Sequence, residues 1–167
     1  KTLTMKKMLL LVRWIVGLLF IFSGLIKVND PIGLSYKMQE FFEVWNMHFL
    51  NDYALFFSIA MNSFEVLAGV AIIIGWRIKL FSWLLLLLII FFTFLTGYAH
   101  YSGKIKTCGC FGDCLPLTAA QSFYKDLFLL VLILLLVGFQ QYIKSSLSNA
   151  WAFILIALTL VLSTGAQ

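Results

Sequence analysis

The sequence predicts an all-α integral membrane protein, a four-helix transmembrane bundle with a short fifth transmembrane helix. Of its 167 residues, 62% are hydrophobic and only 11% are charged, whereas soluble domains contain about 25% charged residues. The mean hydropathy of the chain is +1.00. Its apolar residues form long, leucine-rich runs that lack the alternation of a membrane β-barrel. Composition and patterning therefore exclude soluble globular proteins and disordered chains.

The apolar runs are long enough to cross a membrane. A helix needs about 20 mostly apolar residues to span a hydrocarbon core of ~30 Å. The candidate runs are Met8–Ile26, Ala54–Gly75, Leu80–Ala99, Phe123–Phe139 and the shorter Ala150–Leu162. We expect the bundle in residues 1–146 and the additional helix in residues 147–167, after which an external domain can follow in the native protein.

Lysine and arginine residues predict the orientation, because they are retained on the cytoplasmic side of a membrane. A cytoplasmic N-terminus places most of them inside, namely Lys1, Lys6, Lys7, Arg13, Arg77, Lys79 and Lys144. We expect a protein of the cytoplasmic (inner) membrane whose two long loops are external or periplasmic. In the first loop, Ser35–Met47 mixes aromatic and charged residues and is expected to lie flat at the interface. Since no basic cluster is longer than Lys6-Lys7, we expect no nucleic-acid partner.

Polar residues inside the spans recur three or four positions apart, so those of one span share a helix face. The sets are Ser23, Lys27 and Asp30; Ser58, Asn62, Glu65 and Gly69; Thr93, Thr96 and His100; and Ser122, Lys125 and Asp126. All four sets lie toward the external ends of their spans. Hydroxyl groups in such positions often bond their own helix or hold helices together, so a packing role competes with a functional one.

Glu65 differs from the other polar residues in its depth, about ten residues or ~15 Å from either end of its span. A charge at this depth costs several kcal/mol and should face the interior of the bundle. Lys27 and Lys125 are its candidate partners in an ion pair. Such a pair is either structural or part of a functional polar site, and the sequence leaves both open.

All three cysteines, Cys108, Cys110 and Cys114, lie in the loop between the third and fourth spans. Two cysteines separated by one residue can close only a small ring, and strain makes such a disulfide easier to reduce. Three cysteines allow one disulfide and one spare thiol, in any of three pairings. An odd external thiol indicates a reactive group or an intermolecular bond.

The surroundings of this loop favour a thiolate. Thr118 and Gln121 predict a capping box at the start of the fourth helix, whose positive dipole end then points back toward Cys114. His100 and the neighbouring lysines add positive charge close by in the sequence, while Asp113 opposes this effect.

Metal binding would use the same residues as thiol chemistry, whereas hydrolysis and nucleotide binding have no support in the sequence. His100 and the three cysteines form a nominal metal-ligand set, although zinc sites usually separate two cysteines by two to four residues. We therefore assign no metal and keep this set as the weaker alternative. The sequence has no serine elbow, phosphate-binding loop or dinucleotide fingerprint, so hydrolysis and nucleotide binding are unsupported.

Over about residues 10–140 the chain resembles the DoxX-like superfamily of membrane proteins, in particular its MauE (methylamine-utilisation) branch. The resemblance is carried by Gly17, Phe20, Ser23-Gly24, Lys27, Asp30-Pro31, Gly33, Glu65, His100, Cys108-Gly109-Cys110-Phe111-Gly112, Leu117-Thr118 and Lys125-Asp126. It implies a redox role linked to disulfide formation in exported partners, together with a thioredoxin-like protein. Other DoxX-like members imply a link to quinones. Cys114 lies outside the matching pattern, and no thioredoxin-like domain or CxxC motif is present.

We therefore expect a thiol–disulfide redox protein that exchanges electrons between an exported or thioredoxin-like partner and a membrane acceptor, with quinone as the candidate. Its reactive residues are expected to be Cys108, Cys110, Cys114 and His100. A proton relay or polar pocket is expected from Lys27, Asp30, Asn62, Glu65, Lys125 and Asp126. The alternative is a non-enzymatic accessory or structural subunit of a membrane complex, and transport of a metal or solute is the third hypothesis.

Overall fold

The computed structural model describes residues 2–29, 31–103, 118–143, 157–159, 161 and 165. The elements in these ranges are α1 (Thr2–Asn29), α2 (Pro31–Val44), η1 (His48–Tyr53), α3 (Ala54–Ile74), α4 (Ile78–Ser102), α5 (Ala119–Gly138) and η2 (Gln140–Tyr142). No β-strand occurs among them, which confirms the all-α prediction.

In the described part of the chain, four helical segments are long and apolar enough to cross a membrane: Met5–Asn29, His48–Ile74, Ile78–Ser102 and Ala119–Gly138. They contain nearly all of the four long runs expected from the sequence. Of the expected fifth span, only Ala157–Thr159 and Val161 are described, all helical. The rest of that span lies outside the described residues, so the additional helix stays a prediction.

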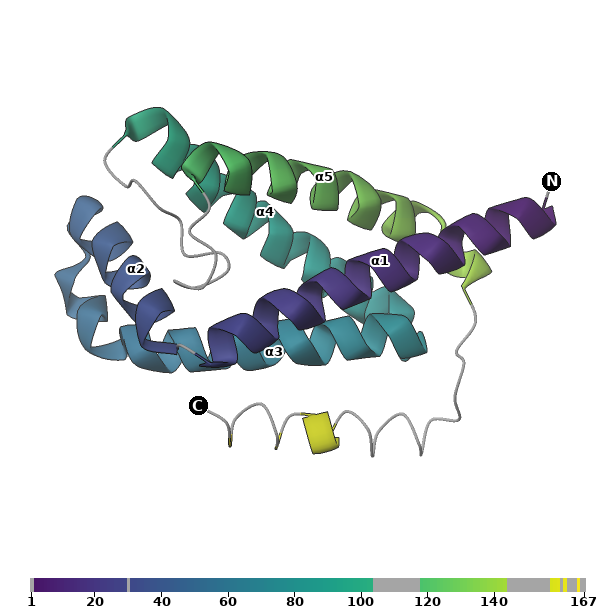
Figure 1. Cartoon of the computed structure of the whole chain (residues 1–167), viewed down its shortest axis with the longest axis horizontal. Helices are drawn as coiled ribbons and strands as arrows, with labels where there is room; N and C mark the ends of the chain where they lie inside the picture. The colour runs from purple at the N-terminus through teal and green to yellow at the C-terminus, as the bar shows by residue number, and fades with distance from the viewer. Residues whose placement is uncertain are drawn as a thin grey trace.

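The four long helices run along the length of the molecule, with α1 beside α3 and α4 beside α5 (Figure 1). Glycines allow α1 and α3 to approach closely. A Cβ atom added to Gly69 would lie 2.8 Å from the carbonyl oxygen of Gly17, and one added to Gly17 would lie 2.9 Å from the oxygen of Gly69. Small residues at a crossing point are a common way to pack helices in membranes, where no hydrophobic force drives association.

Helix α2 lies at one end of the bundle and is steeply inclined to the long helices (Figure 1). It begins at Pro31, because proline is favoured at the first position of a helix. Its Leu34 and Phe41 are buried, whereas Tyr36 is 62% exposed. The helix therefore has a buried face and an exposed face, as expected for a helix that includes most of Ser35–Met47. That this segment lies flat on a membrane stays a prediction.

The capping box expected at the start of the last long helix is present. The backbone N–H of Gln121 donates to the Thr118 hydroxyl at 3.3 Å, and the N–H of Thr118 donates to the Gln121 side chain at 3.1 Å. Helix α5 therefore begins at Ala119, one turn earlier than the apolar run at Phe123–Phe139 suggests. The cap, rather than hydropathy, determines where this helix starts.

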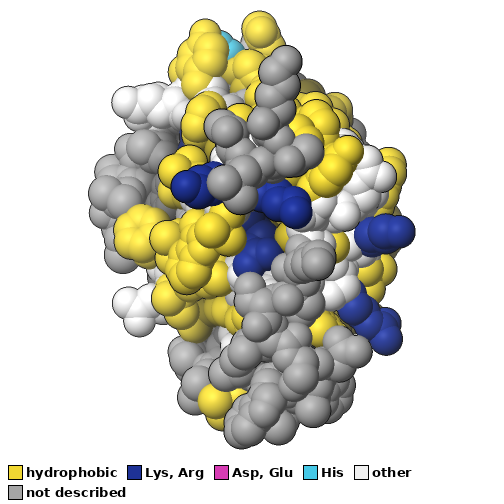
Figure 2. Space-filling view, turned by 90° about the vertical axis from the view of Figure 1, so that its right-hand side faces the viewer, with side chains coloured by type: hydrophobic (Ala, Val, Ile, Leu, Met, Phe, Trp, Pro, Cys, Tyr) yellow, Lys and Arg dark blue, Asp and Glu magenta, His cyan; other side chains and the backbone are white. Residues whose placement is uncertain are grey.

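The interior of the bundle has an apolar part and a polar part. The main apolar cluster includes Val16, Ile72, Leu85 and Ile133, all fully buried. Most of the buried polar residues, among them Lys27, Glu65 and Asp126, lie nearer the end where α1 and α4 finish, whereas Arg13 and Ser82 lie nearer the opposite end. Viewed from the opposite end, where α1 begins, the surface shows lysine and arginine but no acidic side chain (Figure 2).

Candidate functional site

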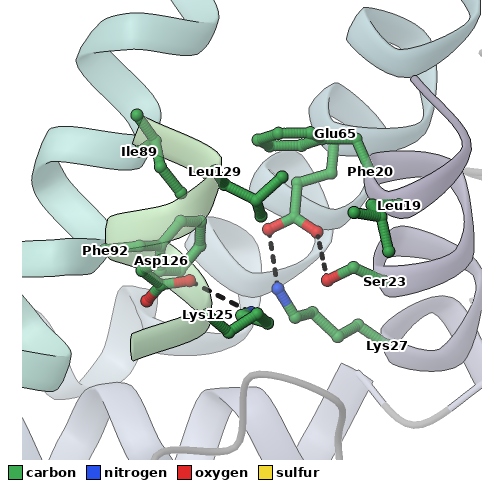
Figure 3. Close-up of a pocket in the computed structure, with 10 residues that line it drawn as sticks. All are labelled: Leu19, Phe20, Ser23, Lys27, Glu65, Ile89, Phe92, Lys125, Asp126 and Leu129. Atoms are coloured by element: carbon green, nitrogen blue, oxygen red, sulfur yellow. Dashed lines mark hydrogen bonds and ion pairs between the residues drawn. The ribbon is translucent and has the colours of Figure 1, made fainter. Parts of the chain in front are cut away.

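A small cavity lies between α1, α3, α4 and α5, in the polar half of the bundle (Figure 3). Its lining combines ionisable, hydroxyl and apolar side chains, namely Lys27, Glu65, Lys125, Asp126, Ser23, Leu19, Phe20, Ile89, Phe92 and Leu129. Its free volume is about 20 Å³, which is room for one water molecule. The cavity therefore brings together ionisable residues from three different helices.

Lys27 and Glu65 form a buried ion pair across the close α1–α3 contact. The distance from Lys27 Nζ to Glu65 Oε1 is 2.6 Å, and the two side chains are only 2% and 1% exposed. The Ser23 hydroxyl donates to the other carboxylate oxygen, Oε2, at 3.2 Å. Figure 3 shows Ser23 and Lys27 reaching the same carboxylate from one helix. This arrangement decides between the two lysines expected as partners of Glu65, in favour of Lys27.

Further contacts hold Lys27 in this position. The side-chain amide of Asn62 donates to the backbone carbonyl of Lys27 at 3.1 Å. That carbonyl is in the last turn of α1, where it has no partner within its own helix. The Lys27 ammonium also lies 4.7 Å from the centre of the Phe92 ring, an attractive cation–π arrangement. Lys27 thus links α1 to both α3 and α4.

A second group lies on α4 and α5. Lys125 Nζ is 3.1 Å from Asp126 Oδ1, with side-chain exposures of 23% and 2%. The Thr96 hydroxyl is 3.1 Å from Asp126 Oδ2, so it is placed to donate to the carboxylate. The same hydroxyl is 2.9 Å from the carbonyl of Phe92, and because it has a single proton it satisfies one acceptor at a time.

The two ion pairs give the cavity no net formal charge. Each buried carboxylate has a lysine and a hydroxyl within hydrogen-bond distance. An isolated charge in an apolar interior is very unfavourable, whereas a paired and hydrogen-bonded one is tolerated. Mutual neutralisation is the physical reason that this bundle can keep Glu65 and Asp126 in its interior.

The size of the cavity limits what it can hold. A free volume of about 20 Å³ admits a water molecule but is smaller than a six-membered quinone ring. A quinone head group therefore does not fit between these side chains in this arrangement.

The remaining expected residues are placed as follows. Asn62 is fully buried behind Lys27. His100 is exposed and stacks on Phe123, with ring centroids 6.2 Å apart, and it does not line the cavity. Thr93 donates to the carbonyl of Ile89 in its own helix at 2.6 Å, the packing role considered for such hydroxyls. Asp30, Cys108, Cys110 and Cys114 lie outside the described residues. In the described part of the chain, no three His, Cys, Asp or Glu side chains gather as a metal site.

Arg13 is a buried charge, although the orientation expected from the sequence counts it among the cytoplasmic residues. It is 4% exposed, and its Nη2 donates to the carbonyl of Ile73 at 2.6 Å. Ile73 lies in the last turn of α3, whose carbonyl groups carry the negative end of the helix dipole. The signal was available, because Arg13 lies within the run Met8–Ile26 and a charge inside a span is expected to have an interior partner.

Comparison with known proteins identifies one family. The family described as methylamine utilisation protein MauE matches residues 5–139. This range begins with the apolar part of α1 and ends one residue after α5, so it includes both ion pairs and the segment with the cysteines. No curated protein and no solved structure matches the chain. With its four membrane-length helices and its match over most of its length, the chain belongs to the MauE family.

Proposed function

We propose that this MauE-family protein is a membrane-embedded thiol–disulfide redox protein that serves as an accessory protein of methylamine utilisation. In this proposal Cys108 and Cys110 exchange electrons with an exported or thioredoxin-like partner. The partner's two thiols become a disulfide while the loop disulfide becomes two thiols. A membrane acceptor, for which quinone is the candidate, then removes two electrons and two protons from the loop.

The observation that carries the proposal is where the cysteine segment joins the bundle. The chain leaves α4 after Ser102 and enters α5 at Ala119. Thr96 and Asp126 each lie about two turns, or ~10 Å, inside these helix ends. The cysteines are therefore connected to the end of the bundle that contains the two ion pairs, so Asp126 is a candidate acceptor for a proton that thiol oxidation releases.

The capped start of α5 supports the same proposal. The capping box at Thr118 and Gln121 directs the positive end of the helix dipole toward the preceding residues, the nearest cysteine being Cys114. A helix N-terminus stabilises a thiolate, which is the form that attacks a disulfide. His100 at the end of α4 is exposed and is available to exchange a proton with this segment.

The experiment that tests this function is thiol trapping on intact cells, which compares the unaltered protein with Cys108→Ser and Cys110→Ser. We expect both variants to stop oxidising the partner, and one of them to accumulate a mixed disulfide with it. Cys114→Ser is measured beside them, because Cys114 lies outside the pattern that the family resemblance carries, and its effect shows whether the cysteine nearest in sequence to the start of α5 takes part in the exchange. Unchanged partner oxidation in both of the first two variants would reject the proposal.

A second candidate function is that of a structural subunit that holds a partner complex in the membrane. It is favoured by the observation that Glu65 and Asp126 are fully occupied by contacts within the bundle. To discriminate, Lys27 and Glu65 are replaced together by methionine and leucine. A structural pair predicts a folded variant that still oxidises the partner, whereas a proton route through Glu65 predicts a folded variant with slow oxidation.

A further inference from the structure

The end of the bundle where α1 begins is strongly basic (Figure 2). Among the residues that the structure describes, its exposed cations are Lys6, Lys7, Arg77 and Lys79. The acids of the described residues all lie elsewhere, in α2, in η1, in the middle of α3 and in the first half of α5; they are Glu40, Glu43, Asp52, Glu65 and Asp126. The positive charge at this end is therefore not offset by any described neighbour of opposite sign.

Two of these cations lie beside a groove. It runs between the α3–α4 turn and the residue that follows η2, and its lining consists of Gly75, Arg77, Ile78, Lys79, Leu80 and Ile143. The groove is shallow and largely open at the surface, with a free volume of about 520 Å³. The charged residues among the described lining are Arg77 and Lys79, both positive, so the groove suits an anion of the size of a phosphate ester.

The surface next to the groove is apolar. Along α4, Leu80, Trp83 and Leu87 are 48%, 53% and 62% exposed, and their spacing of three and four places them on one helix face. Trp76 directly precedes Arg77, whose guanidinium lies 5.6 Å from the centre of the Trp76 ring. Tryptophan is enriched at the depth of the lipid head groups. A ligand with an anionic head and an apolar tail matches both parts of this surface.

We propose that this groove binds the phosphate head group of an anionic phospholipid. Arg77 and Lys79 contact the phosphate, and one acyl chain lies along Leu80, Trp83 and Leu87. Basic pockets at the ends of membrane helices are a known mode of recognition for anionic lipids. A free phosphate ion shares the head-group chemistry, but it would leave the apolar stripe without a ligand. The proposal is independent of the cysteines and of the redox function.

The test measures lipid binding to the purified protein in detergent by native mass spectrometry, with phosphatidylglycerol as the probe. R77Q combined with K79Q is expected to weaken binding roughly tenfold or more, because each lost cation removes a substantial part of the attraction to an anionic lipid. The matched control is K6Q combined with K7Q, which removes the same charge from the same end of the bundle but not from the groove. It should bind nearly as well as the unaltered protein.

Two further binding measurements identify the chemistry of the ligand. Phosphatidylcholine, which has the same phosphate without net negative charge, should bind much more weakly to the unaltered protein, and inorganic phosphate should fail to displace phosphatidylglycerol. Equal binding of the two lipids, displacement by inorganic phosphate, or equal losses in the two double variants would each overturn the proposal. The comparison of lipids uses the unaltered protein, so it stands even if R77Q/K79Q does not fold. Binding that persists in Cys108→Ser/Cys110→Ser separates this result from the redox function.

Discussion

At the residue scale, the chemistry of the bundle depends on how a few buried charges are paired. Lys27 and Glu65 are both almost fully buried, at 2% and 1% exposure, and lie 2.6 Å apart. The pair Lys37–Glu40 has a similar distance, 2.9 Å, but exposures of 20% and 45%. The difference in exposure alone predicts very different consequences when one partner of each pair is removed, because water replaces a lost partner only at the surface.

We predict that Glu65→Gln lowers stability by about 3–5 kcal/mol, because it leaves Lys27 as an uncompensated buried charge. The measurement is thermal unfolding of the detergent-purified protein. Glu40→Gln is the matched control, and its effect should stay below about 1 kcal/mol. Replacing both Lys27 and Glu65 by apolar residues of similar volume should restore most of the lost stability. Equal effects of the two single variants would contradict the buried pair.

Thr96→Val should destabilise the protein by about 1 kcal/mol, because it removes a hydroxyl within reach of the buried carboxylate of Asp126 while keeping the shape of the side chain. Thr93→Val is the comparison, since the Thr93 hydroxyl donates to the carbonyl of Ile89 in its own helix. Equilibrium unfolding in detergent measures both. A larger loss for Thr93→Val would show that Asp126 does not depend on Thr96.

At the scale of the elements, the α1–α3 contact positions the first ion pair. The two helices touch backbone to backbone at Gly17 and Gly69, and Lys27 and Glu65 lie further along the same contact. A side chain inserted at the crossing point forces the helices apart, since a carbonyl oxygen cannot move aside as a flexible side chain can. The geometry of the charged cavity therefore depends on two residues that do not line it.

We expect Gly69→Ala to destabilise the protein by about 1–3 kcal/mol, the usual range for overpacking. Gly138→Ala is the control, because an added Cβ at that position meets nothing within 4 Å. Both are compared by thermal unfolding, and crosslinking between cysteines placed at the outer ends of α1 and α3 reports the separation of the helices. If Gly69→Ala is as stable as Gly138→Ala, the close crossing is not required.

The sequence predicts the helices and the members of the polar site well, but not how the members pair. Hydropathy and periodicity locate Lys27, Glu65, Lys125 and Asp126 on inward helix faces, because both depend only on residues close in the sequence. Which lysine reaches Glu65 depends on the α1–α3 crossing, which no local pattern specifies. The sequence counts Arg13 among the cytoplasmic residues for a similar reason, since its partner is a backbone carbonyl 60 residues away and the pattern of side chains cannot indicate a backbone partner.

At the scale of the whole molecule, the two ends of the bundle differ in charge and are expected to face different compartments. The basic end carries Lys6, Lys7, Arg77 and Lys79, whereas the end with α2 contains the described surface acids. Positive residues are retained in the cytoplasm. This asymmetry predicts that the segment with the cysteines meets an external partner.

The orientation is testable by labelling cysteines with a membrane-impermeant maleimide. Under reducing conditions, Cys108 should be labelled on intact cells. A cysteine at Lys6, in a variant without the native cysteines, should be labelled only after the cells are permeabilised, because it lies at the opposite end of α1. The reverse pattern would place the cysteine segment in the cytoplasm and would exclude exported partners.

The buried pair between α1 and α3 also has a consequence for biogenesis. Lys27 lies in the last turn of α1, which is synthesised before α3, so it can extend its ammonium group to the head-group region before Glu65 has been made. Glu65, in the middle of α3, is too deep to do the same. By the time the ribosome has made α3, however, Lys27 is already in the bilayer. Lys27 thus enters the bilayer before Glu65 does, so Glu65 can form its ion pair as soon as α3 is inserted.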